Sequence, residues 1–264
     1  MRNGRKQLAA AAVWMVLAAL FPAGCGRKLP EPGTTRTIAL PGGVPMEMVW
    51  CPPGRFAMGS PERERDHFEN ERRHRVTLTE GFWMAKYEVT QEQWRDVMGK
   101  FPVWETWKGA DWPVVHATWH DCQAFCRKAG HGLRLPTEAQ WEYACRAGSR
   151  GAYAGTGRLD TMGWYAGNSG EDRQPVGEMA PNAWGLHDMH GNAWEWCEDA
   201  YTEDLGTDAV ANPVVRDGAA RVLRGGSAWE WEASCRSAFR KWAAPSMRFE
   251  FSGFRPVILR EDME

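Results

Sequence analysis

The feature that most constrains the fold of this chain is a long stretch of its second half that lacks regular periodicity. After Gly148 the sequence runs for about fifty residues through Gly, Asn, Asp and Pro without a helical or strand pattern. A segment of that length inside a compact domain needs something to organise it, such as a bound ion or dense aromatic packing. With 16 Trp and 28 Gly in 264 residues, the chain favours a turn-rich fold whose core is filled by large rings. We therefore expect the tryptophans mainly in the core rather than on a sugar-binding surface.

Regular elements are predicted outside this stretch. Short apolar or alternating runs predict strands, two of them around a Pro-Pro-Gly turn. These runs lie within 46–60, 75–79, 82–89, 221–227 and 253–259. Capping threonines and closing glycines predict three helices, which follow Thr90, Thr118 and Thr137 and end at Gly99, Gly130 and Gly148. Two helices carry an apolar face that we expect in the core, formed by Trp119, Cys122, Cys126 and Ala129 in one and by Trp141, Ala144 and Cys145 in the other.

The N-terminus has the pattern of a targeting segment. Basic residues precede an apolar run over 8–21, which is too short to span a hydrocarbon core of about 30 Å comfortably, so residues 1–24 are predicted to be a signal peptide. Ala23-Gly24-Cys25 resembles the lipobox of bacterial lipoproteins, which implies that Cys25 carries the lipid. Pro22 departs from the aliphatic residue usual in that motif, and an ordinary cleaved signal with a free Cys25 is the alternative.

This segment implies export and a lipid anchor in the bacterial envelope. Gly26 after the cysteine favours the periplasmic face of the outer membrane. Residues 25–43 are then expected to be a flexible tether, and residues 44–264 a single domain. The membrane is therefore one expected partner. The net charge is −2, so no global field indicates nucleic acid.

Seven short motifs carry a family resemblance through their order. They are Met58-Gly-Ser60, Glu88-Val-Thr-Gln91, Arg134-Leu-Pro-Thr-Glu138, Asn182-Ala-Trp-Gly-Leu186, Gly191-Asn-Ala-Trp-Glu-Trp196, Arg224-Gly-Gly-Ser227 and Gly253-Phe-Arg255. Together they resemble the formylglycine-generating enzyme (sulfatase-modifying factor) family, over about Met48 to Leu259. The resemblance implies an α+β domain of the formylglycine-generating enzyme fold, which is C-type-lectin-like and has little regular secondary structure.

The resemblance also implies a structural calcium ion. Oxygen ligands on a loop suit Ca²⁺, and the family's motif assigns Asn192, the carbonyl of Ala193, and Glu195 as ligands. A second family site maps onto Asn168, with Asp172 as a weaker match. In the alternative interpretation, these side chains bind backbone amides. The histidine pairs His116/His120 and His187/His190 lack a matched third ligand and are interpreted as structural.

The cysteines bear on catalysis. The family's oxidation uses two cysteines, five residues apart, that bind Cu(I) as thiolates between the Gly-Gly-Ser and Gly-Phe-Arg motifs. This chain has only Cys235 in that interval, while Glu232 holds the expected second position and the first lies near Ser227. The copper pair is therefore predicted to be incomplete. Cys235 is the catalytic candidate if the protein is active.

Disulfides are the other expected use of cysteine, because an exported domain meets an oxidising compartment. The family's disulfides would use Cys126 and Cys145, but their partner positions here carry Pro256 and Ser237. Cys235 could replace the partner of Cys145, with Cys197 as an alternative. Six cysteines allow 15 pairings, and the sequence does not choose among them.

Three functional hypotheses follow. The first is the family's oxygen-dependent oxidation of a cysteine to formylglycine in a sulfatase peptide of the type Cys-x-Pro-x-Arg. The second is a periplasmic oxidase that acts on a different substrate. The third is a non-catalytic envelope lipoprotein that uses the same scaffold to bind a protein or glycan partner. The resemblance as a whole favours the first hypothesis, which is the family's own activity. The single Cys235 and the export signal fit the third, which is the alternative.

Overall fold

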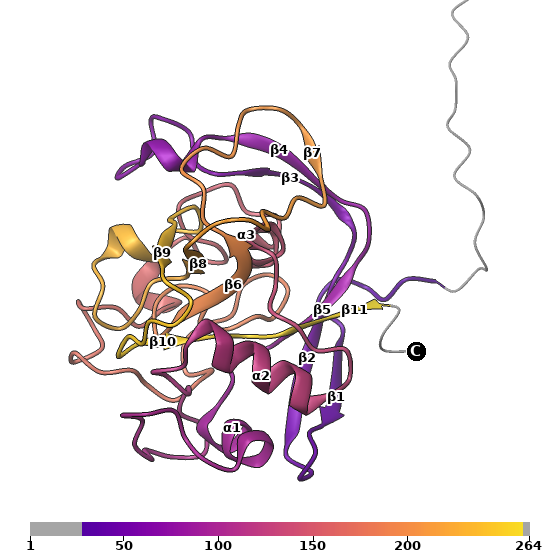
Figure 1. Ribbon diagram of the computed structural model, residues 1–264. Helices are drawn as coiled ribbons and strands as arrows, with labels where there is room; N and C mark the ends of the chain where they lie inside the picture. Colours follow the sequence, from indigo (N-terminus) through magenta and orange to yellow (C-terminus); the bar gives the residue numbers. More distant parts are fainter. Residues whose placement is uncertain (1–27, 261–264) are drawn as a thin grey trace, which may run out of the picture.

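The computed structural model describes residues 28–260, in which three small sheets and three short helices are joined by long loops (Figure 1). The first sheet has the order β1-β2-β5-β11, the second β10-β6-β8-β9 and the third β3-β4-β7. The strands are β1 (Thr35–Ala39), β2 (Pro45–Cys51), β3 (Gly54–Met58), β4 (His74–Leu78), β5 (Phe82–Ala85), β6 (Trp194–Ala200), β7 (Val210–Ala211), β8 (Arg221–Arg224), β9 (Lys241–Ala243), β10 (Ser252–Gly253) and β11 (Val257–Leu259). The helices are α1 (Gln91–Met98), α2 (Trp119–Ala129) and α3 (Glu138–Arg146), with short 3₁₀ turns at Glu69–Glu71, Leu159–Thr161 and Glu232–Cys235. This is the expected α+β fold with little regular structure.

The first sheet joins the two ends of the domain. β5 lies between β2 and β11, antiparallel to both, so Met84 is opposite Val49 on one side and Val257 on the other. β1 extends the sheet by pairing along its whole length with β2. The prediction that the tether runs to Gly43 is therefore wrong, because its second half contains a hydrogen-bonded strand. The signal peptide and Cys25 lie outside the described residues.

The two strands predicted around the Pro-Pro-Gly turn both form, but in different sheets. β2 pairs with β1 and β5, whereas β3 pairs with β4. Pro52 and Pro53, which lack backbone N–H donors, separate them. The strand predicted over 82–89 is shorter than expected and ends at Ala85.

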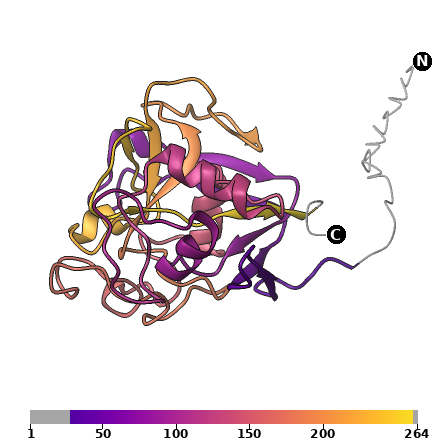
Figure 2. The ribbon, with the colours of Figure 1, turned by 60° about the horizontal axis from the view of Figure 1, so that its bottom comes forward.

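The three helices begin where their caps predicted. Thr90, Thr118 and Thr137 each form a complete capping box with the residue three positions later. α1 and α2 pack side by side across one face (Figure 2). The predicted apolar faces are buried, although Trp119 is only partly so and donates from Nε1 to the carbonyl of Cys197 at 2.8 Å. α3 ends one residue earlier than predicted, with Ala147 in the left-handed region at φ 42°.

Buried polar side chains organise the long loop after α3. The Asn182 amide donates to the carbonyls of Ala144 and Cys145 at 2.8 and 3.0 Å, and its oxygen accepts from the amides of Trp184 and Leu186. One side chain thus ends the helix and folds the loop. Gly191 is required where two loop segments touch, because a Cβ there would lie 1.9 Å from the Trp164 carbonyl oxygen.

Within residues 28–260, no helix is long and apolar enough to cross a membrane.

Candidate functional site

The centre of the domain is a buried ion pair between Glu195 on β6 and Arg255 just before β11. Arg255 Nε donates to Glu195 Oε2 at 2.8 Å and Nη2 donates to Oε1 at 2.7 Å, and both side chains are fully buried. Trp141 Nε1 adds a hydrogen bond to Oε2 at 2.7 Å. Glu195 was predicted as a calcium ligand, and the structure shows that both of its oxygens have protein partners.

Two further carboxylates face this pair and lack full compensation. Glu88 lies 4.0 Å from Arg255, and neither of its buried oxygens has a hydrogen-bond partner among the described residues. Asp188 Oδ2 accepts from the amide of Gly177 at 2.7 Å, but Oδ1 has no such partner. Burial raises the pKa of Asp188 to about 6, and burial together with Asp188 raises that of Glu88 well above its usual range. Three carboxylates therefore surround one guanidinium.

The predicted calcium ligands differ in how well they fit a cation. Asn168 does not fit, because its oxygen accepts from the Tyr165 amide and its nitrogen donates to the Gly163 carbonyl. Asn192 accepts from the Gln174 amide at 2.9 Å, and its buried Nδ2 lacks a partner in the described part of the chain. No three His, Cys, Asp or Glu side chains within residues 28–260 already form a metal cage. The unpartnered oxygens of Glu88 and Asp188, in contrast, are hard ligands of the type that Ca²⁺ prefers.

The Glu88–Asp188 pair was not identified from the sequence as a possible cation site. In the sequence, Glu88 is simply the first residue of the Glu88–Gln91 motif, and Asp188 is one residue of the aperiodic stretch. Neither position carries a pattern that indicates a ligand. The two carboxylates matter because they lie near the same guanidinium, that of Arg255. Burying two negative charges beside one positive charge is costly unless a proton or a cation balances the second.

Cys235 lies in a small closed cluster that excludes solvent. Its side chain is 0% exposed and packs with Leu159, Tyr165 and Tyr153. Gly226 passes so close that a Cβ there would lie 2.6 Å from the Cys235 sulfur. Burial raises the pKa of the thiol above its usual range, and the thiolate is the form that reacts and binds metals. A copper(I) pair does not fit here, because no second cysteine lies in this cluster in the described structure.

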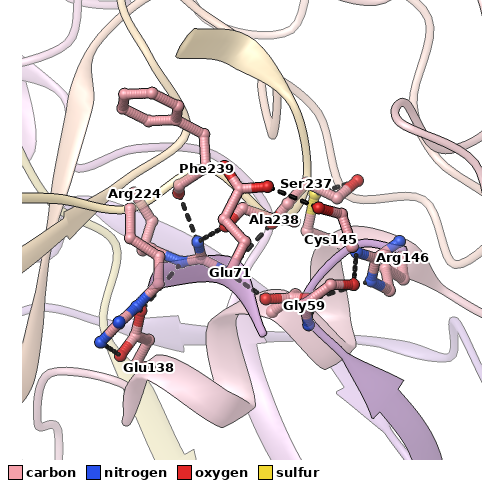
Figure 3. A network of polar contacts seen from close by, with 12 residues as sticks. Gly59, Glu71, Glu138, Cys145, Arg146, Arg224, Ser237, Ala238 and Phe239 are labelled. Atoms are coloured by element: carbon pink, nitrogen blue, oxygen red, sulfur yellow. Dashed lines mark hydrogen bonds and ion pairs between the residues drawn. The ribbon is translucent and has the colours of Figure 1, made fainter. Parts of the chain in front are cut away.

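The segment after Cys235 is fixed by buried arginines (Figure 3). Arg224 on β8 donates to the carbonyls of Ala238 and Ser237 at 2.8 and 3.0 Å, and also to that of Phe239 and to Glu142 on α3. Flanking pairs hold both ends of the segment. These are Arg236 with Glu71 at 2.6 Å and Arg240 with Glu138 at 2.6 Å. Cys235 therefore has little freedom to reach a substrate.

His190 holds Cys235 from the other side. Its Nδ1 donates to the Cys235 carbonyl at 2.8 Å, so Nε2 is the acceptor from the Ala154 amide at 3.0 Å. This arrangement needs a neutral ring, and burial lowers the pKa of His190 to about 4. The expectation of a structural histidine is confirmed at this position.

None of the expected disulfides forms within residues 28–260. All six cysteines there are free and buried. The Cys145 sulfur instead contacts the Ser237 hydroxyl at 3.6 Å and the His190 ring at 3.7 Å. Cys235 does not replace Ser237 as its partner, because the imidazole of His190 lies between the sulfur of Cys145 and the backbone of Cys235. Cys126 packs in the core beside α1, and the Cys197 thiol faces the Glu195 carbonyl.

A surface of exposed tryptophans adjoins the long loop. The loop segment 171–173 contacts two segments that carry exposed tryptophans. The carbonyl of Glu171 accepts a hydrogen bond from Trp229 Nε1, and Arg173 forms an ion pair at 2.6 Å with Glu105, which follows Trp104. Trp104, next to Glu105, is 72% exposed, and Trp231, two residues after Trp229, is 74% exposed. We call residues 104–108, 171–173 and 229–231 the tryptophan surface. The expectation that the tryptophans fill the core thus holds for only some of them, including Trp50, Trp83, Trp94, Trp141, Trp194 and Trp196.

Together, this fold and its buried Glu195–Arg255 centre define a formylglycine-generating-enzyme-like domain. Residues 41–260 match the family described as the sulfatase-modifying factor enzyme 1-like domain, and the chain belongs to that family.

Relatives of different kinds share the domain. The formylglycine-generating enzyme of Bos taurus is 29% identical over 289 residues, covering 82% of this chain and 76% of its own. A protein named chaperone protein LppX, of Paenibacillus barcinonensis, is 28% identical over 238 residues, covering 69% of this chain and 79% of its own. Among solved structures, Treponema denticola variable protein 1 superposes with a TM-score of 0.76 at 25% identity, covering 85% of this chain and 98% of its own.

Proposed function

We propose that this protein is a non-catalytic binding protein of the bacterial envelope, built on the formylglycine-generating enzyme fold. The observation that carries the proposal is the state of Cys235, which is fully buried and fixed between His190 and the Arg224 network. The family's oxidation needs two reactive thiolates, and this chain offers one inaccessible thiol in the corresponding interval. The kinship with a protein named a chaperone is compatible with a role other than oxidation.

The tryptophan surface is the proposed binding face. Rigid aromatic side chains contribute a large contact area at low conformational cost, which is why they are enriched at binding sites. Trp104 and Trp231 are mostly exposed, while Glu105 and Arg173 form a buried ion pair that joins the loop segments 104–108 and 171–173. The expected partner is a protein or a glycan that presents a flat apolar face.

The enzymatic alternative is tested directly by a mass-spectrometric assay. The purified domain, supplied with copper and oxygen, is incubated with a Cys-x-Pro-x-Arg peptide, with Cys235→Ser alongside. We expect no aldehyde from either protein and no alkylation of Cys235 in the native wild type. Aldehyde formation that is lost in Cys235→Ser would overturn the proposal and make Cys235 catalytic.

The binding face is tested by site-specific photo-crosslinking in the native host. A photoreactive amino acid replaces Trp104 or Trp231, with replacement of Trp242 as the matched control. Trp242 is also exposed, at 56%, but its ring contacts Tyr201, with centroids 5.8 Å apart, and Tyr201 does not belong to the tryptophan surface. We expect a discrete crosslinked product or glycan-array binding that depends on positions 104 and 231. Equal amounts of crosslinked product from all three positions would contradict the assignment. So would the absence of any crosslinked product combined with the absence of glycan binding.

Two supporting roles belong to the same proposal. A structural Ca²⁺ is proposed beside Glu88 and Asp188, which have unpartnered oxygens, because three carboxylates there outnumber the single guanidinium of Arg255. A lipid on Cys25 is proposed to hold the domain at the periplasmic face of the outer membrane. Both are tested by the experiments described in the Discussion.

A further inference from the structure

A cavity lies at the end of α3, and none of its lining residues belongs to the tryptophan surface. Its volume is about 420 Å³, and it opens between the edge strand β3, the segment around Pro61 and the start of the long loop. Two kinds of side chain dominate its walls. The basic ones are Arg55, Arg73, Arg146 and Arg150, and the aromatic ones are Phe56, Tyr143 and Trp184.

The charge of this cavity is positive without local compensation. Arg55, Arg73 and Arg150 are exposed, and none of them has a carboxylate partner within residues 28–260. Arg146 is buried and is neutralised by Glu142 at 2.8 Å. No Asp or Glu is among the residues that line the cavity in the described structure. Three unpaired guanidinium groups therefore face one opening.

The end of α3 does not offset this charge. The last carbonyls of a helix are normally a partly negative feature, because they lack partners within the helix. Here the carbonyls of Ala144 and Cys145 accept from the Asn182 amide, and those of Tyr143 and Arg146 accept from the amides of Ala147 and Ser149. Because the last carbonyls of α3 already accept hydrogen bonds, they contribute little negative charge to the cavity.

Polar and aromatic groups complete the lining. The Ser149 hydroxyl is buried and has no hydrogen-bond partner among residues 28–260. The Tyr143 ring meets Trp184 edge-on, with centroids 5.0 Å apart, and contacts Phe56 at 5.2 Å. The three rings therefore form one continuous aromatic part of the cavity wall, in addition to the arginines.

We infer that this cavity binds a small organic oxyanion, a phosphate ester or carboxylate attached to a flat ring. Arginine recognises both groups through paired N–H donors, and a hydrophobic wall with a few convergent polar groups is typical of small-molecule sites. A cation is disfavoured by the three unpaired guanidinium groups. A long polyanion is disfavoured because the overall net charge is −2 and the basic groups are local.

The inference is tested by isothermal titration calorimetry at low ionic strength with phenyl phosphate as the probe. Inorganic phosphate and phenol are the two separate halves of that probe, and benzoate represents the carboxylates. We expect phenyl phosphate to bind at least tenfold more tightly than inorganic phosphate, and phenol not to bind detectably. Binding should weaken as salt is added, because exposed arginines contribute to it.

Variants assign the binding to this cavity. Arg55→Gln/Arg73→Gln should weaken phenyl phosphate binding at least tenfold with little change in the melting temperature, since both side chains are exposed. Arg127→Gln, which removes an exposed arginine from α2, is the matched control and should leave the affinity unchanged. No binding of phenyl phosphate or benzoate at millimolar concentration would overturn the inference. Equal affinities of the double variant and the control for phenyl phosphate would overturn it as well. Equal affinities for phenyl phosphate and inorganic phosphate would contradict the part of the inference that assigns a flat ring to the ligand.

Discussion

Arg255 donates three hydrogen bonds to Glu195, from Nε to both carboxylate oxygens and from Nη2 to Oε1, and neither side chain is exposed to solvent. Arg255 also donates to the carbonyls of Lys86 and His187 at 3.1 and 2.9 Å. A single guanidinium thus joins the end of β5, the long loop and β6. The Gly-Phe-Arg and Gly-Asn-Ala-Trp-Glu motifs of the family meet in this contact, so their joint occurrence reflects one buried ion pair.

The first prediction concerns the loss of this cation. In Arg255→Met, Glu195, Glu88 and Asp188 would remain buried without a counter-charge, and removing one partner of a buried pair typically costs about 3–5 kcal/mol. We expect a decrease of that size in the free energy of unfolding, measured by urea denaturation. Arg248→Met is the control, because Arg248 pairs with Asp121 at 2.7 Å in a partly exposed site. A surface pair contributes about 1 kcal/mol or less, so equal losses in the two variants would contradict the role given to Arg255.

The helices could be predicted from the sequence because their signals are local. Each capping box uses two residues three positions apart, and the apolar faces repeat within one helix. The strand order could not be read in this way. β5 pairs with β11 from the far end of the chain, and β2 and β3 enter different sheets although only two residues separate them.

The site was predicted in part, for the same reason. The family motif identified Glu195, but its partner Arg255 lies 60 residues away, and only the fold shows that the pair satisfies both oxygens. Cys235 was correctly identified as the one thiol in its interval, while its burial depends on Tyr153, Leu159 and Tyr165 from the aperiodic loop. The sequence has no periodic signal there, because buried side-chain hydrogen bonds replace regular elements.

The second prediction concerns calcium. If Ca²⁺ balances the excess of carboxylates around Arg255, excess chelator should lower the melting temperature, and added Ca²⁺ should restore it. Asp188→Asn should reduce that response, because it removes one of the two unpartnered carboxylates. Differential scanning calorimetry measures both effects. An unchanged melt in chelator would mean that a proton on Glu88, whose pKa is raised by burial, balances the charge instead.

The third prediction concerns acid sensitivity at His190. Because the pKa of His190 is lowered to about 4 in the folded state, its neutral form favours folding. This contribution is complete above the unfolded pKa of about 6.5 and is lost as the pH falls towards 4, by up to about 3 kcal/mol. His190→Gln should flatten the decline, since an amide cannot titrate, whereas His120→Gln on the exposed face of α2 should leave it intact. Urea denaturation from pH 7 to pH 4 measures the three curves. Parallel curves would contradict a buried neutral imidazole.

The fourth prediction has the opposite sign and concerns Asp199 at the end of β6. Burial, and then Glu138, raise its pKa to about 7, so the folded state retains the proton more strongly than the unfolded state. The resulting stabilisation is complete below about pH 4 and is lost as the pH rises towards 7, by up to about 4 kcal/mol. Asp199→Asn should remove this dependence. It also weakens one of the two hydrogen bonds that Asp199 accepts, which come from the backbone amides of Glu138 and Val215. The exposed Asp204→Asn is the control, and an identical slope in both variants would refute the assignment.

The last prediction concerns the N-terminal segment. If Cys25 follows a lipobox, cells given an alkyne-tagged fatty acid should label the full-length protein and leave it in the detergent phase on partitioning. Cys25→Ser should lose both properties, because the thiol is the acceptor of the lipid. Pro22 replaces the aliphatic residue usual at its position, so Pro22→Leu should raise the labelled fraction if processing is limited there. Labelling that persists in Cys25→Ser would place the lipid elsewhere. An unlabelled protein cleaved before Cys25 would instead indicate an ordinary secreted domain, because a signal peptide alone leaves no membrane anchor after cleavage.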